Sequence, residues 1–134
     1  MGRDRILMSV ELNHTIVHAR NQRDSAEFLA EILDLDSPRA FYHFLTVRLA
    51  NGVTLDFMET DAPIEIQHYA FLVSEAEFDA IFERIRERGL PFWADPGHTR
   101  PNEINRNDGG RGLYFDDPSG HYLEIITRPY GVTE

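Results

Sequence analysis

Apolar and polar positions along the chain follow a pattern that occurs twice, a helical stripe followed by strands. The spacing predicts a helix that begins at Ser74, where Ser74 and Glu77 form the signature of a capping box, and that ends before Gly89. Its apolar positions recur every three or four residues, at Phe78, Ile81, Phe82 and Ile85.

An earlier stretch with the same spacing predicts another helix. Asp24 is its expected N-cap, and Pro38 closes the region. Its apolar stripe consists of Phe28, Leu29, Ile32 and Leu33. Strands rich in aromatic and β-branched residues follow each helix. They are FYHFLTVRLA at 41–50 and VTLDFMET at 53–60, then PFWAD at 91–95, GLYFDD at 112–117 and HYLEIIT at 121–127.

The two halves of the chain share one order of segments, which predicts an internal repeat. In each half a strand precedes a helix, and two or three strands follow it. We therefore expect a single α+β domain over residues 1–134, made of repeats at about 9–60 and 64–131, with mixed sheets and one helix per repeat. The matched segments are ELNHTIVHA at 11–19 with EIQHYAFLV at 65–73, and GVTLDFMET at 52–60 with GHYLEIITR at 120–128.

The repeat alignment brings four ionisable side chains to equivalent positions. His14 and His68 lie on the first strand of each half, and Asp56 and Glu124 on the last. Because side chains alternate between the faces of a strand, all four are expected on the concave side, away from the bulky residues that pack on the helices. Burying two histidines beside two acids costs desolvation free energy. A divalent metal bound by the imidazoles and carboxylates would offset that cost. The alternative is an ion-pair cluster.

Composition narrows the chemistry further. The chain has no cysteine, and its net charge of −10 comes from 23 acids against 13 bases, all of them arginine. A thiol nucleophile and a lysine Schiff base are therefore excluded, and the acidic surface disfavours binding to nucleic acid. The apolar run within residues 1–10 is too short for a secretory signal, and no segment reaches the roughly 20 apolar residues of a membrane span. We expect a cytoplasmic protein that does not enter membranes.

The segment GGRGLYFDDPSGHYLEIITRPYG, residues 109–131, resembles the C-terminal signature of the vicinal oxygen chelate superfamily. This superfamily includes glyoxalase I, extradiol dioxygenases, fosfomycin-resistance thiol transferases and bleomycin-resistance proteins. The resemblance extends over residues 9–131. It implies paired βαβββ modules that form an open, cup-like sheet around a divalent metal (Fe²⁺, Mn²⁺, Ni²⁺ or Zn²⁺), commonly in a homodimer. The implied metal ligands are His14, His68 and Glu124.

The resemblance also implies catalytic residues. Tyr114 stands ten residues before Glu124, where extradiol dioxygenases have a functional tyrosine. Asp56 occupies the place of a glutamate ligand in glyoxalase I; because aspartate is one methylene shorter, Asp56 is expected to act as a general base or a hydrogen-bond acceptor. The acid–base histidines of extradiol dioxygenases are replaced by Asn105 and by an apolar or hydroxyl residue at 53–54. Ring cleavage of the usual kind is therefore disfavoured.

Further side chains are candidates for substrate contact or for structural roles. Substrate binding is expected of Arg48, Trp93, Asn107 and Tyr122. The remaining histidines are expected in a turn (His121), at the rim (His18) and at the surface without a partner (His43 and His98). The loop at 95–112 has almost no apolar content, and loops of that length are usually functional or mobile.

Two functions remain open. The first is a metalloenzyme of the glyoxalase or dioxygenase type, which would chelate a small-molecule substrate through two vicinal oxygens and carry out an oxygenase reaction or a lyase or isomerase reaction. The second is a metal-free protein of the bleomycin-resistance type that sequesters a cationic small molecule, to which the net charge of −10 is suited. The complete ligand set favours the enzyme.

Overall fold

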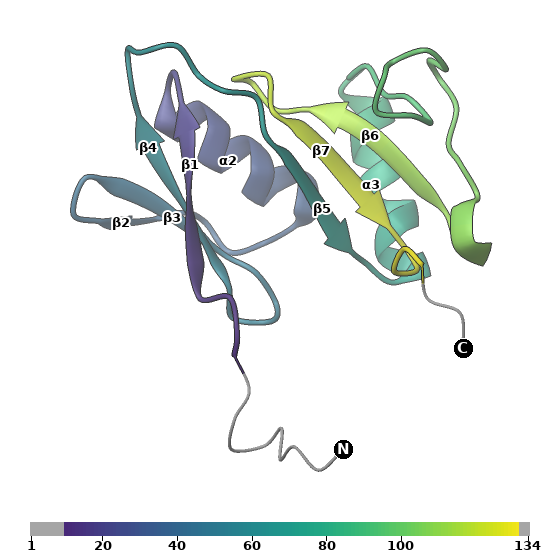
Figure 1. The fold of residues 1–134 in the computed structure, drawn as a ribbon, viewed down its shortest axis with the longest axis horizontal. Helices are drawn as coiled ribbons and strands as arrows, with labels where there is room; N and C mark the ends of the chain where they lie inside the picture. The colour runs from purple at the N-terminus through teal and green to yellow at the C-terminus, as the bar shows by residue number, and fades with distance from the viewer. Residues whose placement is uncertain (1–9, 132–134) are drawn as a thin grey trace.

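The computed structural model describes residues 10–131, in which two sheets lie side by side with two α-helices packed against them (Figure 1). Apart from Val10, the N-terminal segment considered for a secretory signal lies outside the described residues. The elements are β1 His14–Ala19, α2 Gln22–Leu33, β2 Arg39–Phe41, β3 Phe44–Arg48, β4 Thr54–Glu59, β5 His68–Leu72, α3 Glu75–Glu87, the 3-10 helix η1 Asn107–Gly109, β6 Gly112–Asp116 and β7 Tyr122–Ile126.

The strands that the two sheets have in common are paired in the same way, as the internal repeat predicts. The first sheet has the strand order β1-β4-β3-β2 and the second β5-β7-β6. In each sheet the first strand pairs in parallel with the last, β1 with β4 and β5 with β7, and the other pairs are antiparallel. The α+β class with two mixed, open sheets and one helix per half is therefore confirmed.

The second sheet differs from the first at its far edge. The predicted strand at 91–95 contributes only isolated bridges, in which Trp93 pairs with Tyr114 and with Pro101. The chain turns back there instead of extending along β6. The second half thus keeps the order of the first but replaces its edge strand by a loop.

Helix α3 forms as its sequence predicts. The Ser74 hydroxyl accepts a hydrogen bond from the Glu77 backbone N–H (3.1 Å), and the Glu77 carboxylate accepts one from the Ser74 N–H (2.8 Å). This capping box satisfies N–H groups that have no partner within the helix. Gly89 follows the helix with a φ of +64°, a left-handed conformation that glycine adopts without strain. Phe78, Ile81 and Ile85 are buried along the predicted stripe.

The N-cap of helix α2 lies three residues earlier than predicted. Asn21 is the N-cap, since its side-chain oxygen accepts a hydrogen bond from the backbone N–H of Asp24 (3.1 Å). Asp24 lies instead in the first turn, where its charge is favourable at the positive end of the helix dipole. The prediction of Asp24 as the cap was wrong because asparagine and aspartate cap equally well. The helix ends at the left-handed residue Asp34 (φ 57°), before Pro38.

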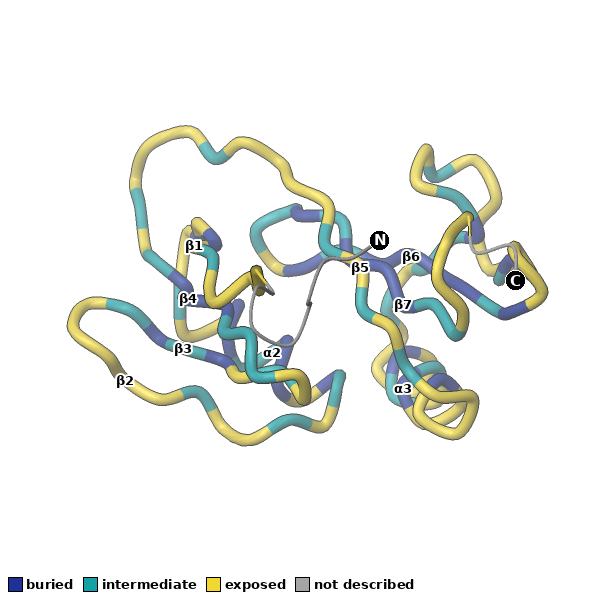
Figure 2. The backbone as a smooth tube through the Cα atoms, turned by 60° about the horizontal axis from the view of Figure 1, so that its bottom comes forward, coloured by how far each residue is buried: buried dark blue, intermediate teal, exposed yellow. Residues whose placement is uncertain are grey.

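The inner faces of both sheets meet the helices in one continuous hydrophobic core (Figure 2). The Phe28 ring of α2 lies 6.2 Å from that of Phe115 on β6, so one helix contacts both halves. Both ring nitrogens of the buried His121 form hydrogen bonds, and the bond to His18 joins the two halves. Nδ1 accepts a hydrogen bond from the Gln67 N–H (3.0 Å), and Nε2 donates one to the His18 carbonyl (2.8 Å). His121 therefore has the structural role expected of it.

Within residues 10–131 no helix has the length and apolar character needed to cross a membrane. Exposed residues make up β2 and most of the connection from β4 to β5, and they are also frequent in the loop that precedes β6 (Figure 2).

Replacing Ser74 with alanine is expected to lower the free energy of unfolding by about 1 kcal/mol, because the capping box then loses its side-chain acceptor. Urea denaturation measures this loss. Ser37→Ala is the matched control, since Ser37 is exposed in the connection from α2 to β2. Equal stabilities of the two variants would contradict a stabilising role for the capping box.

Candidate metal centre

His68 and Glu124 meet on the outer face of the second sheet. Their strands are neighbours in the parallel pair β5–β7, where Ala70 is opposite Glu124 and His68 is opposite Tyr122. His68 Nε2 lies 2.8 Å from Glu124 Oε1. Strand alternation therefore places both side chains on one face, as the sequence predicts, with the core on the other. We call this face the second open face; it carries His68, Ala70, Leu72, Tyr114, Asp116, Tyr122, Glu124 and Ile126.

Glu124 has an unusual environment for a carboxylate. Its side chain is fully buried, and its second oxygen, Oε2, forms no hydrogen bond with any of residues 10–131. An unpaired buried carboxylate oxygen is costly unless a cation or a proton donor satisfies it. His68 is 43% exposed, so the pair is open to solvent on the histidine side. A divalent cation bound by His68 Nε2 and Glu124 fits this donor set of one imidazole and one carboxylate.

His14 does not join this pair within one chain. It lies at the start of β1 in the first sheet, exposed, with Nδ1 2.8 Å from the Asn13 side-chain oxygen. Figure 1 shows that β1, which begins at His14, and β5, which begins at His68, run in opposite directions. Among residues 10–131 no three His, Asp or Glu side chains come together as a possible metal site.

Asp56 is the repeat equivalent of Glu124 but has a different partner. It is 7% exposed, and its Oδ1 accepts a hydrogen bond from the Thr46 hydroxyl (3.1 Å). Thr46 lies opposite Asp56 as Tyr114 lies opposite Glu124. The first open face, on which Asp56 lies, carries His14, Ile16, His18, Phe44, Thr46, Arg48, Thr54, Asp56 and Met58.

Tyr114 lies beside the His68–Glu124 pair, at the position that the sequence predicts. It is 5% exposed, and its ring centre is 5.6 Å from that of His68. Burial raises the pKa of the Tyr114 phenol, and the neighbouring Glu124 carboxylate raises it further. The Tyr114 hydroxyl lies 3.0 Å from that of Tyr130, a residue that sequence reasoning did not single out. Tyr114 is therefore a neutral hydrogen-bond donor near neutral pH.

The four candidate substrate-binding residues lie in different parts of the fold. Tyr122 is on the second open face, and Trp93 is bridged to Tyr114 at its edge. Arg48 is exposed on the first open face, and Asn107 is exposed in η1. In the described part of the chain, the side chains of Arg48 and Asn107 form no hydrogen bond with His68 or Glu124.

His98 was expected at the surface without a partner, and this expectation was wrong. Its ring stacks on that of Trp93, with centroids 3.6 Å apart and an interplanar angle of 3°. His98 Nε2 lies 3.4 Å from Asp116 Oδ1. The signal in the sequence was the polar loop at 95–112 that contains it, but a loop conformation cannot be inferred from strand or helix spacing.

Comparison with known proteins connects this geometry to a family. The profile of the Glyoxalase/Bleomycin resistance protein/Dioxygenase superfamily matches residues 11–125. The chain belongs to this superfamily. The match confirms the resemblance to vicinal oxygen chelate proteins that the C-terminal segment carries.

Relatives within the superfamily include proteins of high similarity. The structure of "Oxidase ChaP-H1" shares 63% sequence identity with a TM-score of 0.90, covering 92% of this chain and 100% of its own. "Oxidase ChaP-H2" shares 60% with a TM-score of 0.90, covering 92% and 98%. "Metallothiol transferase FosB" of Shouchella clausii (strain KSM-K16) is 27% identical over 121 residues, which are 87% of this chain and 79% of that protein. These superfamily relatives are enzymes by name.

Proposed function

We propose that this protein is a metal-dependent oxidase that binds a small substrate through two neighbouring oxygens. The observation that carries the proposal is the buried Glu124 carboxylate, which has an unpaired oxygen and lies 2.8 Å from His68. The similarity to two proteins named oxidases, at 63% and 60% identity over 92% of the chain, favours oxidase chemistry over lyase or isomerase chemistry.

The metal site is proposed to be shared between two copies of the chain. His68 and Glu124 supply two ligands from the second open face, and a symmetric homodimer supplies His14 from the first open face of the other copy. This arrangement is supported by the separation of His14 from His68 within one chain and by the exposure of both histidines. It also covers each open face with an open face of the other copy. In this proposal the two halves of the chain are two repeats of a single domain.

The protein's own groups have distinct roles in this proposal. When bound, a divalent cation supplies Lewis-acid stabilisation of a substrate anion at two vicinal oxygens. Tyr114 donates a hydrogen bond to a substrate oxygen, because burial keeps its phenol protonated. The hydroxyl of Tyr130 orients that of Tyr114. In this proposal Asp56, from the first open face of the other copy, accepts a proton from the substrate.

Metal analysis tests the proposal directly. After reconstitution, the wild-type protein is expected to bind about one divalent ion per chain, and His68→Ala far less. His43→Ala is the matched control, because His43 is exposed at the turn between β2 and β3. Less than about a tenth of an equivalent in the wild type would contradict the enzyme and favour a metal-free binding protein.

The reaction class needs its own measurement. Oxygen uptake is expected with a small molecule that carries two vicinal oxygens, and only in metal-loaded protein. Turnover of such a compound without oxygen uptake would contradict the oxidase and favour a lyase or isomerase.

A further inference from the structure

The stacked rings of Trp93 and His98 form a rigid unit at the edge of the second sheet. Trp93 is fixed to β6 by two backbone hydrogen bonds with Tyr114, of 2.9 and 2.8 Å. His98 lies parallel to the indole with a centroid separation of 3.6 Å, so one face of the indole is covered by imidazole. The Trp93 ring therefore has a fixed position for as long as His98 stays in place.

His98 is itself anchored to the sheet. Its Nε2 is 3.4 Å from Asp116 Oδ1, and its ring centre is 5.2 Å from that of Tyr122. Both contacting atoms are buried, and neither has a hydrogen-bond partner in residues 10–131. The contact between His98 and Asp116 is therefore the polar contact that both atoms share among the described residues.

Asp116, which contacts His98, lies in the same cross-strand row as the proposed metal ligand His68. Across the second sheet, Asp116 is opposite Tyr122, and Tyr122 is opposite His68. This row spans two strand spacings, which is about 10 Å from Asp116 to His68. The unit of Trp93 and His98 therefore borders the open face on which the substrate would lie.

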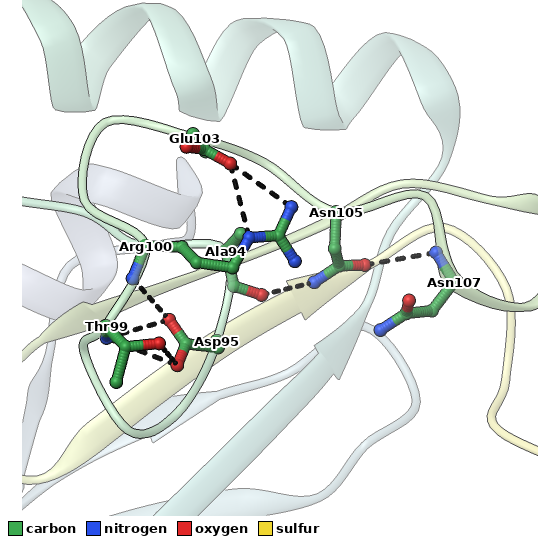
Figure 3. A network of polar contacts seen from close by, with 7 residues as sticks. All are labelled: Ala94, Asp95, Thr99, Arg100, Glu103, Asn105 and Asn107. Carbon is green, nitrogen blue, oxygen red and sulfur yellow. Dashed lines mark hydrogen bonds and ion pairs between the residues drawn. The ribbon is translucent and has the colours of Figure 1, made fainter.

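A polar network holds the loop that presents His98 (Figure 3). The Asp95 carboxylate accepts hydrogen bonds from the Thr99 N–H and hydroxyl and from the Arg100 N–H. The Asn105 side chain donates one to the Ala94 carbonyl (2.8 Å). His98 has a φ of 59° within this loop, a left-handed conformation that is rare for histidine. The hydrogen bonds of this network stabilise the loop in which His98 has that conformation.

We propose that His98 is a positioning residue that fixes Trp93 as a wall for the planar part of the substrate. The proposal rests on the proposed function, since it assumes a substrate bound beside His68 and Glu124. A pre-organised indole binds a flat ring without first losing its own rotational freedom. Loss of His98 thus weakens substrate binding and leaves the chemical step at Tyr114 and Glu124 unchanged.

Fluorescence tests the positioning directly, because Trp93 is the sole tryptophan of the chain. In His98→Ala, Trp93 emission is expected to shift to longer wavelength, and quenching by acrylamide to increase about threefold or more as the indole becomes exposed. His98→Phe keeps an aromatic ring and is expected to restore both properties. Asp116→Asn removes the charge that anchors His98 and is expected to give an intermediate result.

Two outcomes would overturn the proposal, and one of them needs no enzyme assay. His43→Ala, which removes an exposed ring stacked on Phe44, is the fluorescence control. Equal emission and quenching in wild type and His98→Ala, with circular dichroism showing both folded, would refute the positioning of Trp93 whether or not the protein binds metal. With a substrate in hand, KM is expected to rise about three- to tenfold in His98→Ala with kcat unchanged. A fall in kcat at unchanged KM would also refute it.

Discussion

Replacing Glu124 with glutamine is expected to lower the affinity for divalent metal by more than about 100-fold, because even residues that only support a ligand contribute up to that factor. The same change is expected to leave the metal-free protein at least as stable as wild type. The unpaired Oε2 of Glu124 carries a desolvation penalty of about 1–3 kcal/mol, and a neutral amide of the same shape carries less. A residue retained at a cost to stability is typical of a functional site.

Asp56→Asn is the matched control for this prediction. Asp56 is the buried carboxylate at the equivalent place in the first sheet, but its oxygen already accepts a hydrogen bond from Thr46. Its replacement is expected to leave metal affinity close to that of wild type. Competition with a chelator measures affinity, and urea denaturation measures the stability of the metal-free forms. If Glu124→Gln bound metal normally and were several kcal/mol less stable, Glu124 would be a structural residue.

The elements of the fold could be predicted wherever a local rule decides them. The capping box of Ser74 and Glu77 specifies where α3 begins, and the repeat in the sequence predicts equivalent strands in the two halves. Local rules failed where two residues compete for one role, as Asn21 and Asp24 do at the start of α2. They also failed at Trp93, where the predicted strand is reduced to isolated bridges with Tyr114 and Pro101.

Strand alternation was sufficient to bring His68 and Glu124 to one face, because a period of two residues assigns each side chain to a side of the sheet. The same rule places His14 on the first open face. It cannot specify which other sheet, in the same chain or in another copy, packs against that face. That depends on how sheets, and copies of the chain, pack together. His98 lies outside any regular element, so its stack on Trp93 depends on a loop network that no spacing encodes.

Co-expression of two variants that do not bind metal on their own is expected to recover metal binding. His14→Ala and Glu124→Gln each remove a ligand from both proposed sites of a homodimer, so neither alone should bind metal. In a hybrid dimer, one site loses both ligands, while the other combines His14 from one chain with intact His68 and Glu124 from its partner. Random pairing makes half of the dimers hybrid, and co-expressed subunits should therefore bind about a quarter of the wild-type amount of metal.

The recovery depends on which chain supplies each ligand, and a second mixture checks this. His68→Ala and Glu124→Gln affect ligands that the structure places 2.8 Å apart on one chain. Every site in their hybrid then lacks one ligand, and no recovery is expected. If His14, His68 and Glu124 met within one chain, neither mixture would recover metal. Recovery in the first mixture alone thus requires a site shared between two copies, with the first open face of one against the second open face of the other.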